Sequence, residues 1–217
     1  MRARFTVDEI ASAALGIVDR SGPAALSMRA LATALGTGPM TMYNYVADKE
    51  ALEELVVAAV VAEITVPAPT GDWQDDVHAM ATAMWRGVRA HPAAIPLVLT
   101  RRMSSATGFA IADALVAALG RAGLSDGDRL SAFHAVLGLV TGSAQAQLAG
   151  PLTGGAPEAA NRIGSVAADE YPHIETLSQV AARTPVTEDF DGGLRMLIDG
   201  IAMRAGAATR ARAALPD

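Results

Sequence analysis

The sequence predicts an all-α protein, and three observations support that prediction. Apolar residues make up 51% of the 217 residues, while aromatic residues make up only 4%. Ala, Leu and Met, which favour helices, are prominent among them. The apolar positions recur at helical spacing, and no sustained alternating pattern of the strand type is present. Side chains suited to capping stand in front of several of these stretches.

The composition also restricts the setting of the protein. The longest uninterrupted apolar run, Leu55–Ala62, is far short of the ~20 residues that a membrane-spanning helix needs. The first residues lack the apolar core of a signal peptide. Cysteine is absent, which excludes disulfides and thiolate metal sites. We therefore expect a cytoplasmic protein without membrane contact, long enough for one large or two small domains.

Three helices are predicted at the start of the chain, and each has a recognisable beginning. Thr6 and Glu9 form a capping-box pattern in front of the first helix, which Gly22-Pro23 ends. Ser27 is placed to cap the second helix, and a glycine stops it. Pro39 opens the third, because proline is tolerated in a first turn. The residues expected to face inward in the first two helices are Ile10, Ala13, Ala14, Ile17, Val18, Met28, Leu31, Ala32 and Leu35.

Longer helices are predicted in the rest of the chain. Asp48 caps a fourth helix at about 48–64, and Pro67–Gly71 is the clearest break. Asp72 then caps a helix that runs to about residue 90, where His91-Pro92 interrupts it. After a short segment to about residue 99, the remaining helices are expected at about 104–122, 126–149, 157–168, 173–182 and 187–206.

Residues 27–49 have the layout of a helix-turn-helix. Two short helices joined by a glycine-containing turn are followed at once by a capped, longer helix. In such a motif the second short helix enters the major groove of DNA while the first braces it. The side chains that this second helix projects are Thr41, Tyr43, Asn44 and Tyr45.

The charge of this region is neutral, which tempers the prediction of DNA binding. Residues 1–50 carry five basic and five acidic side chains, so the net charge of −6 belongs to the rest of the chain. Because phosphate contacts supply much of the affinity for DNA, a neutral DNA-binding head (residues 1–50) predicts that one copy binds DNA with modest affinity. We therefore expect a dimer that uses two heads.

Taken together, these elements resemble the TetR family of bacterial transcriptional repressors. The matching stretches in the head are Leu26–Ala32, Leu35–Gly38, Met40–Val46 and Asp48–Leu52. Further stretches are similar to the C-terminal domain of the tetracycline-repressor branch; they are Asp72–Asp75, His91-Pro92, Phe190–Leu194 and Leu197–Gly200. The resemblance implies a helix-turn-helix DNA-binding domain over residues 1–50 and a ligand-binding and dimerisation domain over residues 51–217. The helix at about 48–64 would connect the two.

The resemblance also implies which residues contact a double-stranded DNA operator. They are Ser27, Arg29, Pro39, Met40, Thr41, Tyr43, Asn44, Tyr45 and Lys49. Their chemistry fits, because hydroxyl groups bind phosphates, Asn reads adenine edges, and Thr or Met packs on a thymine methyl group. Two alternatives stay open: Tyr43 as a core aromatic residue and Arg29 as a solvated helix residue. Met42, between exposed candidates, is expected in the core.

A small organic effector is the second partner that the resemblance implies. Its binding would change the spacing of two heads that must sit ~34–36 Å apart, and so release a repressor from its operator. Candidate pocket residues, for which ordinary core packing is the alternative, are Met80, Met84, Trp85, Val98, Met103, Phe109, Phe133, His134 and Leu137. The tetracycline repressors hold the drug's magnesium with a His in the stretch that here reads Ile95–Leu99, without His or acid. An apolar or mildly polar effector is therefore expected.

Metal binding and catalysis have no positive support in the sequence. The four histidines, His78, His91, His134 and His173, include no i, i+4 pair, so metal-ligand spacing is missing. Asp75-Asp76 suits the dipole at a helix start better than a catalytic pair. We therefore expect neither an enzyme nor a cofactor. The alternative function is a small-molecule-binding protein with a weak or vestigial DNA head.

Dimerisation is expected through two helices. The helix at about 126–149 carries Gly138, Gly142 and Ala146 on one face, and small residues permit close approach. The last helix carries an apolar stripe of Leu194, Leu197, Ile198 and Ile201. In the family these helices build a four-helix interface, which implies an isologous homodimer on a palindromic operator. The alternative is that both stripes are buried within one chain.

Overall fold

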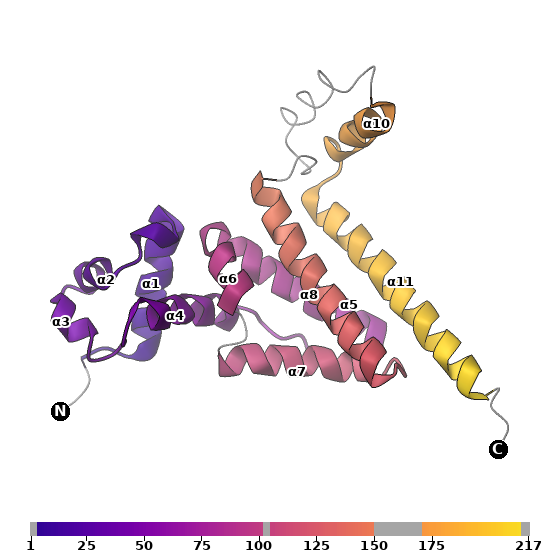
Figure 1. Cartoon of the computed structure of the whole chain (residues 1–217), viewed down its shortest axis with the longest axis horizontal. Helices are drawn as coiled ribbons and strands as arrows, with labels where there is room; N and C mark the ends of the chain where they lie inside the picture. The colour runs from indigo at the N-terminus through magenta and orange to yellow at the C-terminus, as the bar shows by residue number, and fades with distance from the viewer. Residues whose placement is uncertain (1–3, 102–104, 150–170, 214–217) are drawn as a thin grey trace. The chain divides into compact units, whose positions relative to one another are not determined.

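The computed structural model describes residues 4–101, 105–149 and 171–213, and these residues are helical with no strand among them (Figure 1). The all-α prediction is confirmed. The helices are α1 (Val7–Ser21), η1 (Pro23–Ala25), α2 (Met28–Ala34), α3 (Pro39–Met42), α4 (Lys49–Ala62), α5 (Trp73–Ala90), η2 (Pro92–Ala94), α6 (Ile95–Arg101), α7 (Ala106–Gly120), α8 (Asp126–Ala149), α10 (Pro172–Ala181) and α11 (Val186–Ala213). The helix expected at 157–168 lies outside the described residues.

The chain divides into two compact units. The first comprises residues 1–68 and 83–116, and the second comprises residues 69–82 and 117–217. The first unit extends well beyond the predicted domain boundary at residue 50, because α4 packs along α1 and against α6. Helix α5 contributes residues to both units, so a boundary drawn at one point of the sequence does not describe the packing.

Side-chain caps fix the beginnings of the helices in the first unit. The Thr6 hydroxyl accepts the backbone N–H of Glu9, and the Glu9 carboxylate accepts the N–H of Thr6 at 2.7 Å, which confirms the predicted capping box. Ser27 accepts the N–H of Ala30, and Asp48 accepts the N–H of Ala51. The largest fully buried side chains of this unit include Ile10, Leu26, Leu31, Met42, Leu52, Trp85 and Ile95.

Asp76 has a larger role than the predicted complement to a helix dipole. It is buried, and its carboxylate accepts both the backbone N–H of Thr70 at 2.6 Å and the Thr70 hydroxyl at 2.8 Å. It also pairs with Arg121. The backbone hydrogen bond from Thr70 is the main reason that the pKa of Asp76 lies below its ordinary value. Asp76 therefore ties the segment before α5 to the end of α7.

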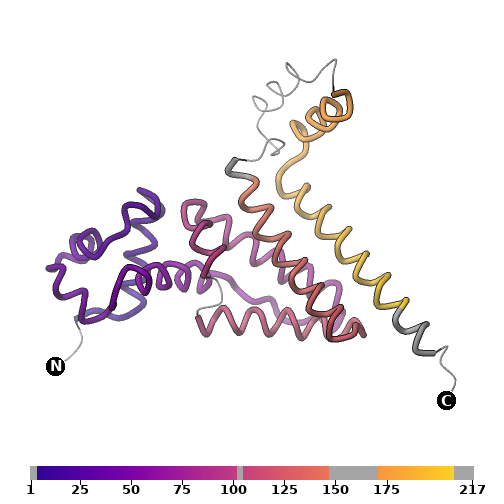
Figure 2. Tube along the Cα trace, viewed as in Figure 1, coloured from indigo at the N-terminus to yellow at the C-terminus, as the bar shows by residue number. Residues whose placement is uncertain are grey.

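Helices α8 and α11 run side by side in the second unit (Figure 2). Val136, Val140 and Ala144 on α8 and Leu194, Ile198 and Ile201 on α11 are buried within the chain. Three of the four residues of the stripe predicted for dimerisation are thus used within the chain, and that part of the prediction is wrong. Gly138 and Gly142, in contrast, are exposed, and a Cβ at either would meet no atom within 4 Å.

No single helix among the described residues is long and apolar enough to cross a membrane. The bent pair Pro92–Arg101 and Ala106–Gly120, with 77° between its members, reaches the necessary length and composition only when the two are taken together.

Candidate nucleic-acid interface

A tight, hydrogen-bonded turn connects α2 to α3. Gly36 has a φ of +62°, in the left-handed region that favours glycine, and it follows the last residues of α2. The N–H of Thr37 reaches back to the carbonyl of Ala32 at 2.9 Å, which closes the turn. On the inner side, Met28 and Met42 anchor the two helices, and Met42 is completely buried as predicted. The outer side of α3 is thereby turned to solvent.

Helix α3 is a single turn, shorter than the sequence pattern suggests. It ends at Met42, whose carbonyl accepts the N–H groups of Tyr45 and Val46 at 2.9 Å. The chain therefore continues in hydrogen-bonded turns through residues 43–46 before Asp48 caps α4. These turns hold Tyr43 and Asn44 on the exposed surface beside α3.

Most of the predicted DNA contacts lie on the surface. The exposed ones are Ser27, Arg29, Pro39, Met40, Tyr43, Asn44 and Lys49, while Thr41 and Tyr45 are half-buried. Met40 is 78% exposed and Tyr43 is 53% exposed, so neither belongs to the core. Ser27 also caps α2, which uses its oxygen as an acceptor and leaves its O–H free to donate.

Tyr45 lies against the segment that precedes α1. Its hydroxyl oxygen accepts the backbone N–H of Arg4 at 2.9 Å and that of Phe5 at 3.4 Å. The rings of Phe5 and Tyr45 meet edge to face, with centroids 6.0 Å apart. Sequence reasoning missed Arg4 and Phe5, because their partner is 41 and 40 residues away and no local pattern indicates it.

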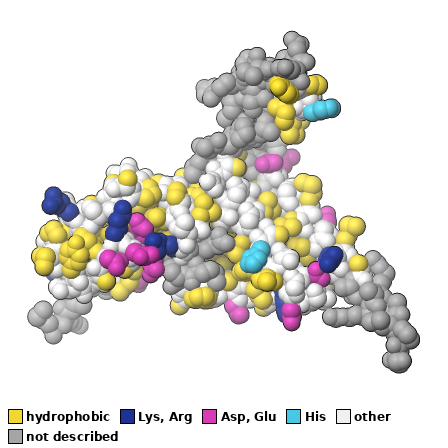
Figure 3. Space-filling model, in the orientation of Figure 1, with side chains coloured by type: hydrophobic (Ala, Val, Ile, Leu, Met, Phe, Trp, Pro, Cys, Tyr) yellow, Lys and Arg dark blue, Asp and Glu magenta, His cyan; other side chains and the backbone are white. Residues whose placement is uncertain are grey.

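Basic and acidic side chains are interspersed over the face of the first unit that Figure 3 shows, rather than gathered into a basic patch. Lys49 lies 3.7 Å from the carboxylate of Glu53. Arg101 donates to Glu50 at 2.5 Å and also lies within 4.0 Å of Glu53 and Glu54. The start of α4 is therefore rich in carboxylates, in keeping with the neutral charge of the head.

His91 joins three elements of the first unit. Its Nδ1 lies 2.9 Å from the carboxylate of Asp19 on α1, and its Nε2 lies 2.9 Å from that of Glu63 at the end of α4. Burial by itself would lower the pKa of His91, but the hydrogen bonds to Glu63 and Asp19 outweigh it and raise the pKa. An imidazolium can donate to both carboxylates at once. The sequence indicated only a helix end at this position.

The predicted effector residues are divided between the two units. In the first unit Trp85 and Val98 are buried, Met84 is half-buried, and Phe109 is 55% exposed. Arg89 lies over the Trp85 ring, 5.1 Å from its centroid.

In the second unit Met80 and Leu137 are buried, Phe133 is half-buried, and His134 is exposed. Met103 lies outside the described residues. Within those residues, no cluster of three or more potential metal ligands occurs.

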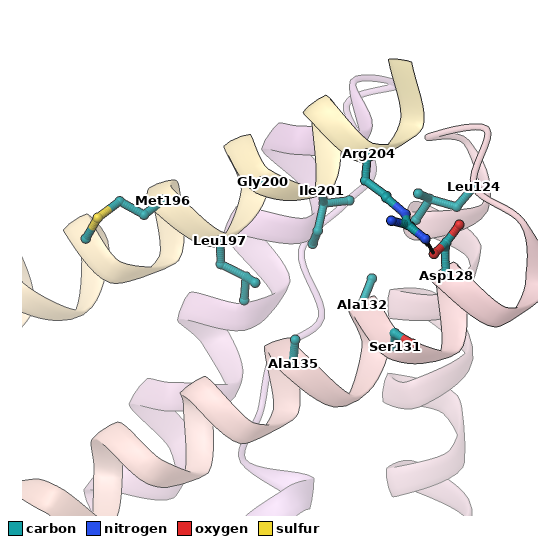
Figure 4. Close-up of a pocket in the computed structure, with 10 residues that line it drawn as sticks. All are labelled: Leu124, Asp128, Ser131, Ala132, Ala135, Met196, Leu197, Gly200, Ile201 and Arg204. Atoms are coloured by element: carbon teal, nitrogen blue, oxygen red, sulfur yellow. Dashed lines mark hydrogen bonds and ion pairs between the residues drawn. The ribbon is translucent and has the colours of Figure 1, made fainter. Parts of the chain in front are cut away.

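A cavity of about 340 Å³ lies between α8 and α11 (Figure 4). Its lining contains none of the predicted effector residues; it consists of Leu124, Asp128, Ser131, Ala132, Ala135, Met196, Leu197, Gly200, Ile201 and Arg204. Small and apolar side chains form most of it, and an ion pair of 3.0 Å between Asp128 and Arg204 stands at one end. The Met196 side chain is 72% exposed beside this groove.

Comparisons with known proteins all find similarity to bacterial transcriptional regulators. Residues 66–205 match the family model described as "Tetracyclin repressor-like, C-terminal domain". An "HTH-type transcriptional regulator" of Saccharopolyspora erythraea is 35% identical over 144 residues, or 66% of this chain and 61% of that protein. The chain thus spans less than two thirds of that relative's length. The "HTH-type transcriptional repressor DrrR1" of Streptomyces coeruleorubidus is 29% identical over 215 residues, covering 91% of this chain and 77% of DrrR1.

A solved structure shares the fold across almost the entire chain. Apo ActR from Streptomyces coelicolor superimposes with a TM-score of 0.82 at 28% identity, covering 96% of this chain and 100% of ActR. ActR has also been solved in complex with actinorhodin, and that structure matches with a TM-score of 0.78 at 27% identity.

Proposed function

The chain belongs to the TetR family of transcriptional regulators, and on that premise we propose that it is a homodimeric, cytoplasmic repressor rather than an enzyme. In this proposal α2 and α3 bind operator DNA, and a small organic molecule releases it. The observation that supports DNA binding most directly is the orientation of α3. Met42 anchors its inner side and Met40 stands exposed on its outer side, while Tyr43 and Asn44 stand exposed in the turns that follow it.

Each exposed side chain has a suitable role at DNA. Asn44 is proposed to read a base edge, because its amide can donate and accept at once. Met40 packs on a thymine methyl group, and Tyr43 and Thr41 donate hydroxyl protons to phosphates. Arg29 and Lys49 hold the backbone on either side of the groove, with Ser27 and Pro39 close to it.

The exposed face of α8 and α11 is the proposed dimer interface. Gly138 and Gly142 leave open space on α8, and Met196 and Met203 on α11 are 72% and 76% exposed. Methionine adapts to irregular gaps, so these side chains suit the groove that a second copy presents. The interface therefore uses residues other than Leu194, Ile198 and Ile201, which one chain buries by itself.

The proposed effector is a mildly polar organic molecule and not a metal–tetracycline complex. Helix α6 buries Ile95, Leu97 and Val98 in the stretch where a metal ligand would be needed. ActR, which has the same fold, is known in complex with actinorhodin. We propose an effector of that general chemistry, with an aromatic body and a few polar groups.

Selection of duplexes from a random-sequence pool tests the proposal. The wild-type protein should enrich a palindromic sequence, bind it more tightly than a shuffled duplex at ~100 mM salt, and release it on addition of an aromatic effector such as actinorhodin. A tetracycline with Mg²⁺ serves as the contrasting probe. Enrichment of no sequence, together with tight binding of actinorhodin, would instead support a small-molecule-binding protein whose DNA head is vestigial.

A further inference from the structure

We propose that Arg4 is an additional DNA contact and that Tyr45 is the residue that positions it. The inference rests on the proposed function, because it concerns how the head reaches DNA. It changes the role of Tyr45 from a direct contact to an anchor for the segment before α1, which we call the arm (residues 4–6).

The arm contacts the chain on both sides of α3 in the sequence, at Tyr45 after the helix and at Gly36 before it. After α3, the Tyr45 hydroxyl accepts the backbone N–H groups of Arg4 and Phe5, and the Phe5 ring packs against the Tyr45 ring. Before α3, the Arg4 guanidinium donates to the carbonyl of Gly36 at 3.4 Å. Because α3 is a single turn, contacts with residues shortly before and after it place the arm near the element that would occupy the major groove.

The Arg4 side chain is loosely held in this position. It is exposed, its bond to Gly36 is long, and its guanidinium lies 5.2 Å from the Phe5 ring centroid. In the part of the chain that the structure describes, none of the ion pairs involves Arg4. A guanidinium with free donors beside a groove-binding helix is suited to a phosphate or to the edge of the neighbouring minor groove.

A neutral head makes one such cation important. Lys49 and Arg101 are both close to carboxylates of α4, and these negative charges weaken the attraction of either cation for a DNA phosphate. Each phosphate neutralised by a cation contributes about 0.9 to the slope of log affinity against log salt concentration. Arg4 should therefore carry a measurable share of that slope.

A double-mutant cycle separates the two roles of Tyr45. The probe is a duplex that the wild-type protein selects from a random pool, and the variants are Arg4→Gln, Tyr45→Phe and their combination. We expect Arg4→Gln to weaken binding about 3- to 10-fold at ~100 mM salt and to lower the salt slope by about 0.9. Tyr45→Phe should lower the slope as well, although it changes no charge, and it should add little to Arg4→Gln.

The matched control is Arg20→Gln, which removes the same charge from the exposed end of α1. It should leave the slope close to the wild-type value, and thermal unfolding should be similar for all variants. The proposal is overturned if Arg4→Gln behaves like Arg20→Gln. It is also overturned if Tyr45→Phe weakens binding at an unchanged slope and in full addition to Arg4→Gln, because the hydroxyl would then contact DNA itself. If the wild-type protein selects no duplex, the proposed function fails as well, which distinguishes that outcome from a failure of the arm alone.

Discussion

The α1–α3 head and the α8–α11 helix pair both expose apolar side chains, but the side chains that surround them differ. In the head, Met40 on the single turn of α3 and Tyr43 just after it stand among hydroxyl, amide and charged groups. In the pair, Met196 and Met203 face the same way along a long helix, beside a neighbour that exposes glycine. Polar groups mixed with a few apolar ones suit a hydrated, charged partner, whereas small and apolar groups suit another protein surface. The difference indicates two partners for the two regions.

The two regions also differ in what fixes their helices. The side-chain oxygens of Thr6, Ser27 and Asp48 accept backbone N–H groups and so cap two helices of the head and its neighbour α4. The pair is held chiefly by apolar contact along its length, with Leu194 and Ile198 completely or nearly buried. The caps therefore fix where each helix of the head begins. In the pair, the apolar contact uses only the facing sides of α8 and α11, and their outer sides stay available to a second copy of the chain.

The largest expected effect is the loss of the dimer when the open face of α8 is filled. Gly142→Leu should raise the dimer dissociation constant by about 100-fold or more, because a large side chain would prevent close helix approach. The monomer should stay folded, since a Cβ at this position meets no atom within 4 Å. Sedimentation velocity measures the change, and Ala117→Leu on the exposed surface of α7 is the control. A Gly142→Leu protein that remains dimeric would place the interface elsewhere.

A glycine that faces the chain's own core should behave in the opposite way. At Gly87 a Cβ would lie 2.6 Å from Cγ1 of Ile64, so Gly87→Ala strains the first unit. Strain of about 1–3 kcal/mol, set against a gain of about 1 kcal/mol in helix propensity, predicts a net loss of up to about 2 kcal/mol in the free energy of unfolding. Urea unfolding at fixed protein concentration measures it.

The partner side chain provides the control for this prediction. In an Ile64→Ala background the obstructing atoms are gone, and Gly87→Ala should become neutral or stabilising. An equal loss in both backgrounds would show that Ile64 is not the cause.

A smaller effect is expected from the polar link at His91. The raised pKa means that the protonated ring stabilises the fold fully below its ordinary pKa near 6.5 and loses that contribution as pH rises through the raised value. His91→Gln should therefore cost about 1–2 kcal/mol at low pH and progressively less at higher pH. Urea unfolding of both proteins from about pH 6 to 9 measures the difference. A difference that stays constant with pH would mean that the charge of His91 does not matter.

The sequence predicted features that depend on neighbours along the chain. The caps at Thr6, Ser27 and Asp48 act within three residues, and Met42 follows from helical spacing, so all four were predicted correctly. Capping and helical spacing depend on residues a few positions apart, so a short stretch of sequence is enough to predict them.

Features that depend on distant residues were missed. His91 meets partners 72 and 28 residues away, and no local signal brings Asp19 or Glu63 to it. The apolar stripe on the last helix was predicted to pack against a second copy of the chain. Helical spacing shows that one face of a helix is apolar, but it does not show which element covers that face. The chain itself buries Leu194 and Ile198 on α11, which packs against α8, and it leaves Met196 and Met203 exposed.

The central claim is that the outer side of α3 and the turns directly after it read a DNA sequence, and Asn44 in those turns tests it most directly. Fluorescence anisotropy at ~100 mM salt should show the wild-type protein binding its selected duplex at least ~10³-fold more tightly than a shuffled one. Asn44→Ala should weaken binding of the selected duplex by about 10-fold or more and leave the shuffled duplex unchanged, because only a base contact distinguishes the two. Equal loss on both duplexes, or none on either, would contradict the account.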